Sequence, residues 1–171
     1  VKRMVNEGHE LASHTAHHLH LGTLSTADVE KEIAAVEKIA KEITGKDLTM
    51  IRAPFGEPFQ LAEQGQMLKE YKVVAPIVNR HAIHIGWNID SFDYACTPGD
   101  GNCAYNNTIS HLPGPGKGDH GVILMHSVHT QTAAALPRII DHIRAKGYKI
   151  WTVEDILKAR YGKTSAQLLN R

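Results

Sequence analysis

The chain alternates short apolar segments with longer amphipathic ones, and this alternation limits the folds that it can adopt. Helix-length segments cover residues 25–45, 60–71, 132–146 and 154–160, and short apolar segments cover residues 48–52, 72–78, 83–89, 121–126 and 148–153. Strands that alternate with helices of this length predict a mainly parallel sheet, either open or closed into a barrel. Residues 90–118 are rich in Gly, Pro, Asn and Asp, which predicts an irregular excursion.

The segment of residues 25–45 gives the clearest helical signal. Ser25 is a capping residue ahead of an amphipathic run, and Gly45 is placed to end the helix. Apolar residues recur at helical spacing at Val29, Ile33, Val36, Ile39, Ala40 and Ile43. We therefore expect a scaffold helix whose charged residues face solvent.

Length and charge exclude several classes of protein. The 171 residues fit a single domain. A net charge of +1 gives no reason to expect a nucleic-acid partner or a polybasic membrane contact. No apolar run approaches the roughly 20 residues that cross a bilayer.

Several of the 12 histidines lie in two clusters, residues 4–21 and 121–130. His14 and His18 are four residues apart and would share one face of a helix. Two imidazoles on one face are a common pair of ligands for a divalent metal. A solvated surface pair is the alternative, and His17 and His20 leave the choice of pair open.

Three further candidates lie where predicted strands end, the edge at which such folds carry their chemistry. His126 suits a general acid or base. Arg52 can hold a carboxylate in its ionised form, and Asp90 can fix the tautomer of a histidine. A hydrogen-bonded core histidine and structural salt bridges are the alternatives.

Cys96 and Cys103 bracket a turn-rich loop. A disulfide in an oxidising compartment and two free thiols are both compatible with this spacing.

The candidate residues, in this order, resemble the motifs of the polysaccharide deacetylase family (carbohydrate esterase family 4, with a NodB-homology domain). The family's second motif is matched by His14-Thr15-Ala16-His17-His18, and its third by Arg52-Ala53-Pro54-Phe55-Gly56. Its fourth is matched by Asp90-Ser91-Phe92-Asp93 with Tyr94 in place of tryptophan, and its fifth by Leu124-Met125-His126. The resemblance spans about residues 3–160.

The resemblance implies a role for each matched residue. His14 and His18 become metal ligands, Arg52 pairs with the catalytic aspartate, and Asp90 orients His126, the general acid. The substrate-binding residues implied are Pro54, Phe55, Gly56, Tyr94 and Leu124.

The family's first motif, an aspartate pair that supplies the catalytic base and the third metal ligand, has no match in the chain. The chain also begins at Val1 rather than at a methionine. We therefore expect a distorted (β/α) barrel that is N-terminally incomplete, with the catalytic domain at residues 1–160 and a tail at 161–171. We expect this fragment to be inactive by itself.

The resemblance implies a metal-dependent hydrolase that removes N-acetyl groups from an N-acetylglucosamine polymer such as peptidoglycan or chitin. The implied metal is Zn²⁺, with Co²⁺ or Ni²⁺ as alternatives, and the expected location is extracytoplasmic. An O-acetyl xylan esterase, a carbohydrate-binding pseudoenzyme and an unrelated zinc hydrolase are the other functions that we consider.

Overall fold

The computed structural model describes residues 1–59, 71–113 and 121–170. Within these ranges the protein is an α/β structure with two short parallel strand pairs. Its residues form two compact units, Val1–Gly86 with Trp151–Arg171, and Trp87–Ile150. None of the helices in the described ranges is long and apolar enough to cross a membrane.

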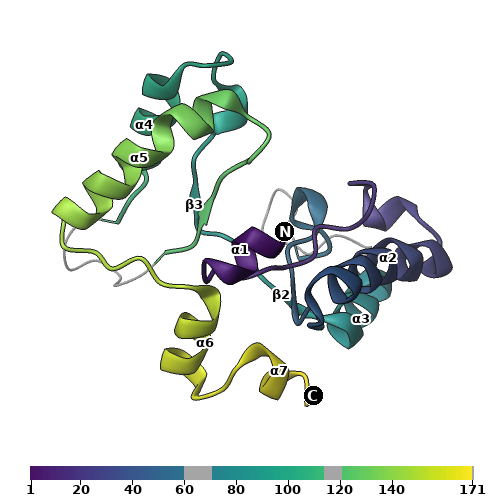
Figure 1. Ribbon diagram of the computed structural model, residues 1–171. Coiled ribbons are helices and arrows are strands. Elements are labelled where there is room, and N and C mark those ends of the chain that lie inside the picture. The colour runs from purple at the N-terminus through teal and green to yellow at the C-terminus, as the bar shows by residue number, and fades with distance from the viewer. Residues whose placement is uncertain (60–70, 114–120, 171) are drawn as a thin grey trace. The chain divides into compact units, whose positions relative to one another are not determined.

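The first unit is built around the parallel pair of β1 (Met50–Ile51) and β2 (Ile83–His84). Ser13 extends this pair through a parallel bridge to Ile51. α2 (Thr26–Thr44) and α3 (Tyr71–His81) pack against each other, as Figure 1 shows. The buried apolar side chains of this unit's main cluster are Leu21, Val29, Ile33, Ile51, Ala53, Val74, Ile77, Val78 and Ala82.

The predicted scaffold helix is confirmed as α2. The Ser25 hydroxyl accepts the Asp28 N–H at 3.2 Å, and Gly45 ends the helix with φ of 72°. Val29 and Ile33 are fully buried, whereas Ile39 on the same helix is 55% exposed. The apolar stripe therefore faces α3 and the strands.

His81 links α3 to α2 through two carboxylates. Its Nε2 lies 2.5 Å from Glu30, and its Nδ1 lies 3.0 Å from Glu37. Glu30 is also paired with Arg80. Burial alone would lower the pKa of His81, but the hydrogen bonds and charges of the two glutamates outweigh it, so its pKa is raised.

Three short helices complete the first unit: α1 (Lys2–Asn6), α6 (Val153–Tyr161) and α7 (Ser165–Leu168). The Glu10 carboxylate accepts the Val153 and Glu154 N–H groups at the start of α6, where a negative charge is favoured. Ser165, within the predicted tail, is buried, and its hydroxyl lies 2.6 Å from that of Thr49.

The second unit contains the parallel pair of β3 (Ile89–Asp90) and β4 (Ile123–Leu124), with α4 (Gly101–Ser110) packed along α5 (Thr130–Ala145). Figure 1 shows the two helices side by side. A disulfide joins Cys96 to Cys103 in α4, with Cα atoms 5.8 Å apart. Of the two alternatives that the sequence leaves open, the structure therefore has the disulfide.

The prediction of a strand over residues 72–78 is wrong, because this segment lies in α3. Its β-branched residues favoured a strand, but the buried positions Val74, Ala75, Ile77 and Val78 follow helical spacing. Burial of this face overrides both the weak helix propensity of valine and the presence of Pro76.

Other predicted segments also differ from the structure. Residues 83–89 are divided between β2 and β3, and residues 148–152 contain no strand. Residues 90–113 are not wholly irregular, since Asp100 caps α4 by accepting the Asn102 and Cys103 N–H groups. The helix predicted over residues 60–71 lies, except for Tyr71, outside the described residues.

Replacing Ile33 with alanine should destabilise the first unit by about 2–5 kcal/mol, because the side chain is fully buried in the main cluster. Ile39→Ala is the matched control on the exposed face and should cost under about 0.5 kcal/mol. Urea denaturation measures both free energies of unfolding. Equal effects would mean that α2 packs through a different face.

His81→Gln should remove part of the pH dependence of stability. The pKa of His81 is higher in the folded protein than its ordinary 6.5, so its ion pairs stabilise fully below pH 6.5 and lose this effect as pH rises through the folded-state pKa. Unfolding free energies measured from pH 5 to 9 should therefore decline more steeply in the wild type than in His81→Gln. The exposed His9→Gln control should follow the wild type.

Candidate active site

The histidine-rich segment of the first unit is a loop, so the expectation of a helix that pairs His14 with His18 is wrong. Thr15 and His18 have φ of 62° and 55°, in the left-handed region that a regular right-handed helix excludes. The loop begins after Ser13, which pairs with Ile51 of β1 through a parallel bridge. The rings of His14 and His18 are nevertheless neighbours, with centroids 4.9 Å apart.

The orientation of His14 suits a metal ligand. Its Nδ1 lies 2.5 Å from the Arg52 carbonyl oxygen, so Nδ1 carries the proton and Nε2 carries the lone pair. A metal-bound imidazole is usually oriented by such a bond. His14 is thus oriented as a metal-bound imidazole would be. The described residues contain no group of three or more His, Cys, Asp or Glu able to hold a metal, and the ligand roles of His14 and His18 stay a prediction.

Two buried carboxylates hold this loop on either side of His18. Glu32 of α2 accepts the His17 N–H at 2.8 Å and lies 2.6 Å from its Nδ1. Glu57 lies 2.8 Å from Nδ1 of His20. Burial would raise the pKa of Glu32, but the hydrogen bonds from His17 outweigh it and hold the pKa below its ordinary value.

Arg52 follows β1 and donates through Nε and Nη2 to the Ile85 and Gly86 carbonyls, at 3.1 Å each. Burial lowers its pKa, although a guanidinium stays charged at neutral pH. His84 lies nearby, and burial together with the charge of Arg52 lowers its pKa to about 4. His84 is therefore neutral at pH 7. The pairing of Arg52 with a catalytic aspartate stays a prediction.

The Pro54–Gly56 turn, η2, presents Phe55 beside the histidines. Pro54 and Gly56 are buried, whereas Phe55 is 43% exposed and has φ of 58°. Its ring stacks on His20 with centroids 3.7 Å apart and meets His18 edge-on at 4.9 Å. A left-handed conformation costs a bulky residue about 1–3 kcal/mol, so its neighbours must hold it there.

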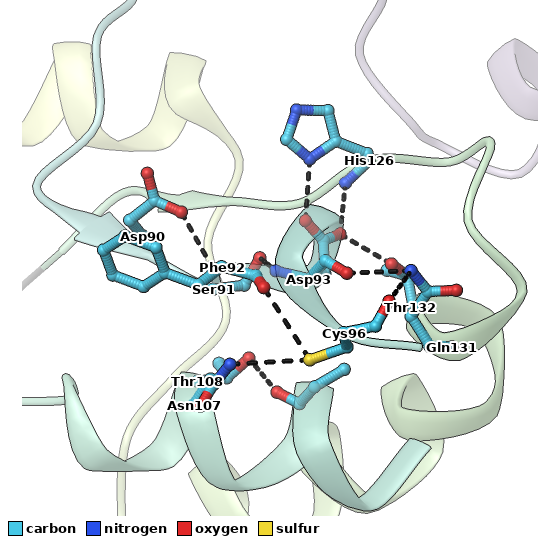
Figure 2. A network of polar contacts seen from close by, with 11 residues as sticks. Asp90, Ser91, Phe92, Asp93, Cys96, Asn107, Thr108, His126, Gln131 and Thr132 are labelled. Atoms are coloured by element: carbon cyan, nitrogen blue, oxygen red, sulfur yellow. Dashed lines mark hydrogen bonds and ion pairs between the residues drawn. The ribbon is translucent and has the colours of Figure 1, made fainter. Parts of the chain in front are cut away.

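The second unit contains a compact acid–base pair, drawn in Figure 2. Asp93, in the short η3 helix (Asp93–Ala95), is almost fully buried. Its Oδ1 lies 2.7 Å from His126 Nδ1, and its Oδ2 accepts the His126 N–H at 2.7 Å and the Thr132 hydroxyl at 2.6 Å. The carboxylate thus fixes the proton on Nδ1 and leaves the lone pair on Nε2.

The interpretation that Asp90 orients His126 is wrong. The Asp90 carboxylate accepts the Phe92 N–H at 2.9 Å, and the orienting carboxylate is Asp93, three residues further along the same motif. Asp90 ends β3 and is half-buried, whereas the following turn places Asp93 beneath His126.

Electrostatics keep Asp93 ionised. Burial would raise its pKa, but the hydrogen bonds from Thr132 and His126 outweigh it and lower the pKa below its ordinary value. Tyr94 follows directly, and its ring meets that of His126 edge-on at 5.6 Å. Burial, and then the charges of Asp90 and Asp93, raise the pKa of Tyr94, so its hydroxyl stays protonated.

Comparison with known proteins relates the chain to polysaccharide deacetylases. The polysaccharide deacetylase family model matches residues 1–75. Peptidoglycan-N-acetylglucosamine deacetylase PgdA of Listeria monocytogenes is 28% identical over 167 residues, which cover 95% of this chain and 31% of the relative. A chitin deacetylase of Pestalotiopsis sp is 33% identical over 154 residues, covering 90% of this chain and 47% of the relative. Residues 1–75 therefore match the polysaccharide deacetylase family.

The chain spans less than half the length of either curated relative. Its fold is also that of solved family structures. One is a family 4 pseudoenzyme from Bacillus anthracis, with a TM-score of 0.68 and 20% identity over 91% of this chain and 49% of that one. This likeness shows a shared fold over residues that lie beyond those matched by the family model.

Some residues of the candidate site carry no sequence signal. Glu32 and Glu57 come from outside the motifs, and only their burial beside His17 and His20 reveals them. Thr132 is likewise identified only by its contact with Asp93. Leu124 lies in β4, in register with Asp90, and its substrate-binding role stays a prediction.

Asp93→Asn should destabilise the second unit by about 1.5–3 kcal/mol, because hydrogen bonds to a buried carboxylate are lost. The pKa of Asp93 lies below its unfolded value near 3.9, so its contribution is present above that pH and is lost as pH falls through the folded-state pKa. Urea denaturation from pH 7 to 2 should therefore show a shallower acid-induced decline in Asp93→Asn. Asp90→Asn is the matched control, and a larger loss there would reverse the assignment.

Proposed function

We propose that this chain carries the catalytic residues of a metal-dependent deacetylase that hydrolyses N-acetyl groups on the amino sugars of a polysaccharide. Peptidoglycan and chitin are the substrates that the names of the relatives suggest. The observation that carries the proposal is the pair of His126 and the buried Asp93. The imidazole is held in one orientation near the end of a parallel strand, where α/β folds have their active-site residues.

His126 would act as the general acid. When Nε2 takes up a proton, the carboxylate of Asp93 stabilises the imidazolium, which then protonates the leaving amine. The His126 side chain is 33% exposed, so a substrate can reach Nε2. Asp93 would be a positioning residue, because it touches the acid rather than the substrate.

His14 and His18 would hold the metal, with Zn²⁺ favoured for imidazole ligands and Co²⁺ or Ni²⁺ as alternatives. A divalent ion supplies polarisation of the acetyl carbonyl and a lowered pKa for the attacking water. The contact of His14 Nδ1 with the Arg52 carbonyl supports this role, because it fixes the proton on Nδ1 and leaves the lone pair, which a metal ligand needs, on Nε2. The resemblance assigns the base and the third ligand to an aspartate pair, and the sequence contains no such pair.

Roles for the remaining implied residues are proposed for each unit separately. We propose that the Phe55 N–H helps to hold the oxyanion, with Pro54 and Gly56 shaping that turn and Arg52 pairing with the catalytic aspartate. Tyr94 would form an aromatic wall of the groove, and Leu124 would line the pocket for the acetyl methyl group.

We propose a distorted (β/α) barrel for the catalytic domain at residues 1–160. The two short parallel strand pairs and the fold of the family structures support it. We also propose an extracytoplasmic location, and the Cys96–Cys103 disulfide supports this, because disulfides persist in oxidising compartments.

The test is acetate release from N-acetylglucosamine oligomers by the full-length protein, with and without a chelator. Chelation should abolish release, and added Zn²⁺ should restore it. His126→Ala should reduce the rate by about 100-fold or more and leave metal content unchanged. His14→Ala should lose both metal and activity, whereas the exposed His9→Ala control should retain both.

Three outcomes would contradict the proposal. Release that survives chelation would exclude the metal, and near-normal release by His126→Ala would exclude the assigned acid. Oligomer binding without any release would favour the carbohydrate-binding pseudoenzyme, which is a real alternative because a pseudoenzyme shares this fold.

A further inference from the structure

The side chains of His20 and Phe55 form a face-to-face stack in the first unit. Their ring centroids lie 3.7 Å apart, and their planes differ by 10°. Phe55 belongs to the η2 turn, and its N–H is the group proposed to hold the oxyanion. His20 lies outside the matched motifs and has no part in the proposed chemistry. The stack therefore joins a residue without an assigned role to a residue of the proposed site.

A buried carboxylate fixes the orientation of the His20 ring. Oε1 of Glu57 lies 2.8 Å from Nδ1 of His20, so Nδ1 carries the proton and donates a hydrogen bond to the carboxylate. Oε2 of the same carboxylate accepts the Gly22 N–H at 2.9 Å. Gly22 follows Leu21, whose side chain is fully buried in the main cluster. The packed scaffold therefore holds the His20 ring, although the His20 side chain is 54% exposed.

Burial of apolar surface does not explain the stack. Phe55 lies outside the main cluster of the first unit and is partly exposed. Its φ of 58° is unfavourable for a bulky side chain. The ring of His20 and the edge of the His18 ring both contact the Phe55 ring and restrain it. An aromatic contact is comparable in free energy with the cost of such a backbone conformation, so loss of the His20 ring should let the turn relax.

We propose that His20, oriented by Glu57, is a positioning residue that holds Phe55 in its left-handed conformation and so directs the Phe55 N–H toward the oxyanion. The inference rests on the proposed function, which assigns that N–H to the oxyanion. The stack exists before a substrate binds, so the donor needs no reorganisation when negative charge develops. His20 acts through Phe55 and needs no contact with the substrate.

Two substitutions separate the ring of His20 from its hydrogen bond to Glu57. His20→Asn keeps an N–H donor for the carboxylate and removes the ring, whereas His20→Phe keeps the ring and removes the donor. A left-handed residue gives a strong nuclear Overhauser effect (NOE) between its own amide and Hα protons, because this conformation brings the two close together. In solution NMR, His20→Asn should weaken this NOE at Phe55, and His20→Phe should preserve it.

Acetate release from the N-acetylglucosamine pentamer by the full-length protein is the second measurement. His20→Asn should lower kcat by about 10- to 100-fold and leave KM within about 2-fold, because the Phe55 N–H would contact a charge that exists only in the transition state. His20→Phe should retain kcat within about 3-fold, because the stack is kept. His9→Asn, at an exposed histidine, is the control and should leave both constants unchanged.

Circular dichroism would identify any variant that fails to fold, and His20→Ala is a second variant without the ring that should behave as His20→Asn does. An unchanged Phe55 NOE or an unchanged kcat in these variants would overturn the inference. A kcat in His20→Phe as low as in His20→Asn would also overturn it, because the stack would then not be what holds the turn.

Acetate release by the wild type separates this inference from the proposed function. If the wild type releases no acetate, the hydrolysis fails, and the Phe55 NOE still decides whether His20 holds the turn. If the wild type releases acetate and His20→Asn matches it in both NOE and kcat, the hydrolysis stands and the positioning role of His20 fails.

Discussion

The second unit depends on one buried charge, the carboxylate of Asp93. Removing a carboxylate from water costs several kcal/mol unless donors replace the lost hydration. Here the donors come from the end of β4 through His126 and from the first turn of α5 through Thr132. Gln131 also donates to the Asp93 backbone carbonyl, at 2.8 Å. The contacts that stabilise the charge therefore also set the direction of the His126 ring, so folding and site geometry share one interaction.

In the first unit, buried carboxylates likewise hold the histidine loop through hydrogen bonds. Glu32 and Glu57 are buried, and each holds one histidine next to His18. A loop without regular structure can keep its rings in place in this way, because its fixed points belong to the packed scaffold. The position of the histidine rings is therefore fixed by carboxylates of the scaffold, and not by a helix as the sequence predicted.

The sequence predicts the scaffold better than it predicts the details of the site. α2 was predictable because Ser25, Gly45 and a helical apolar stripe agree with one another. α3 was not predictable, because its valines favour a strand. The helical spacing of its buried positions becomes visible only in the folded structure. The motifs contain both Asp90 and Asp93, and no local rule decides which one reaches a histidine 33 residues away in sequence. That choice depends on the turn after β3, whose left-handed Phe92 has no recognisable sequence signal.

The left-handed residues Thr15, His18, Phe55 and Phe92 have an evolutionary consequence. Glycine adopts this backbone conformation without the steric penalty of a side chain, so replacement by glycine would relieve local strain at each position. Selection for stability alone would therefore favour the loss of these side chains. Their persistence would require selection for the contacts that those side chains make. At these positions, selection for stability and selection for function would then act in opposite directions.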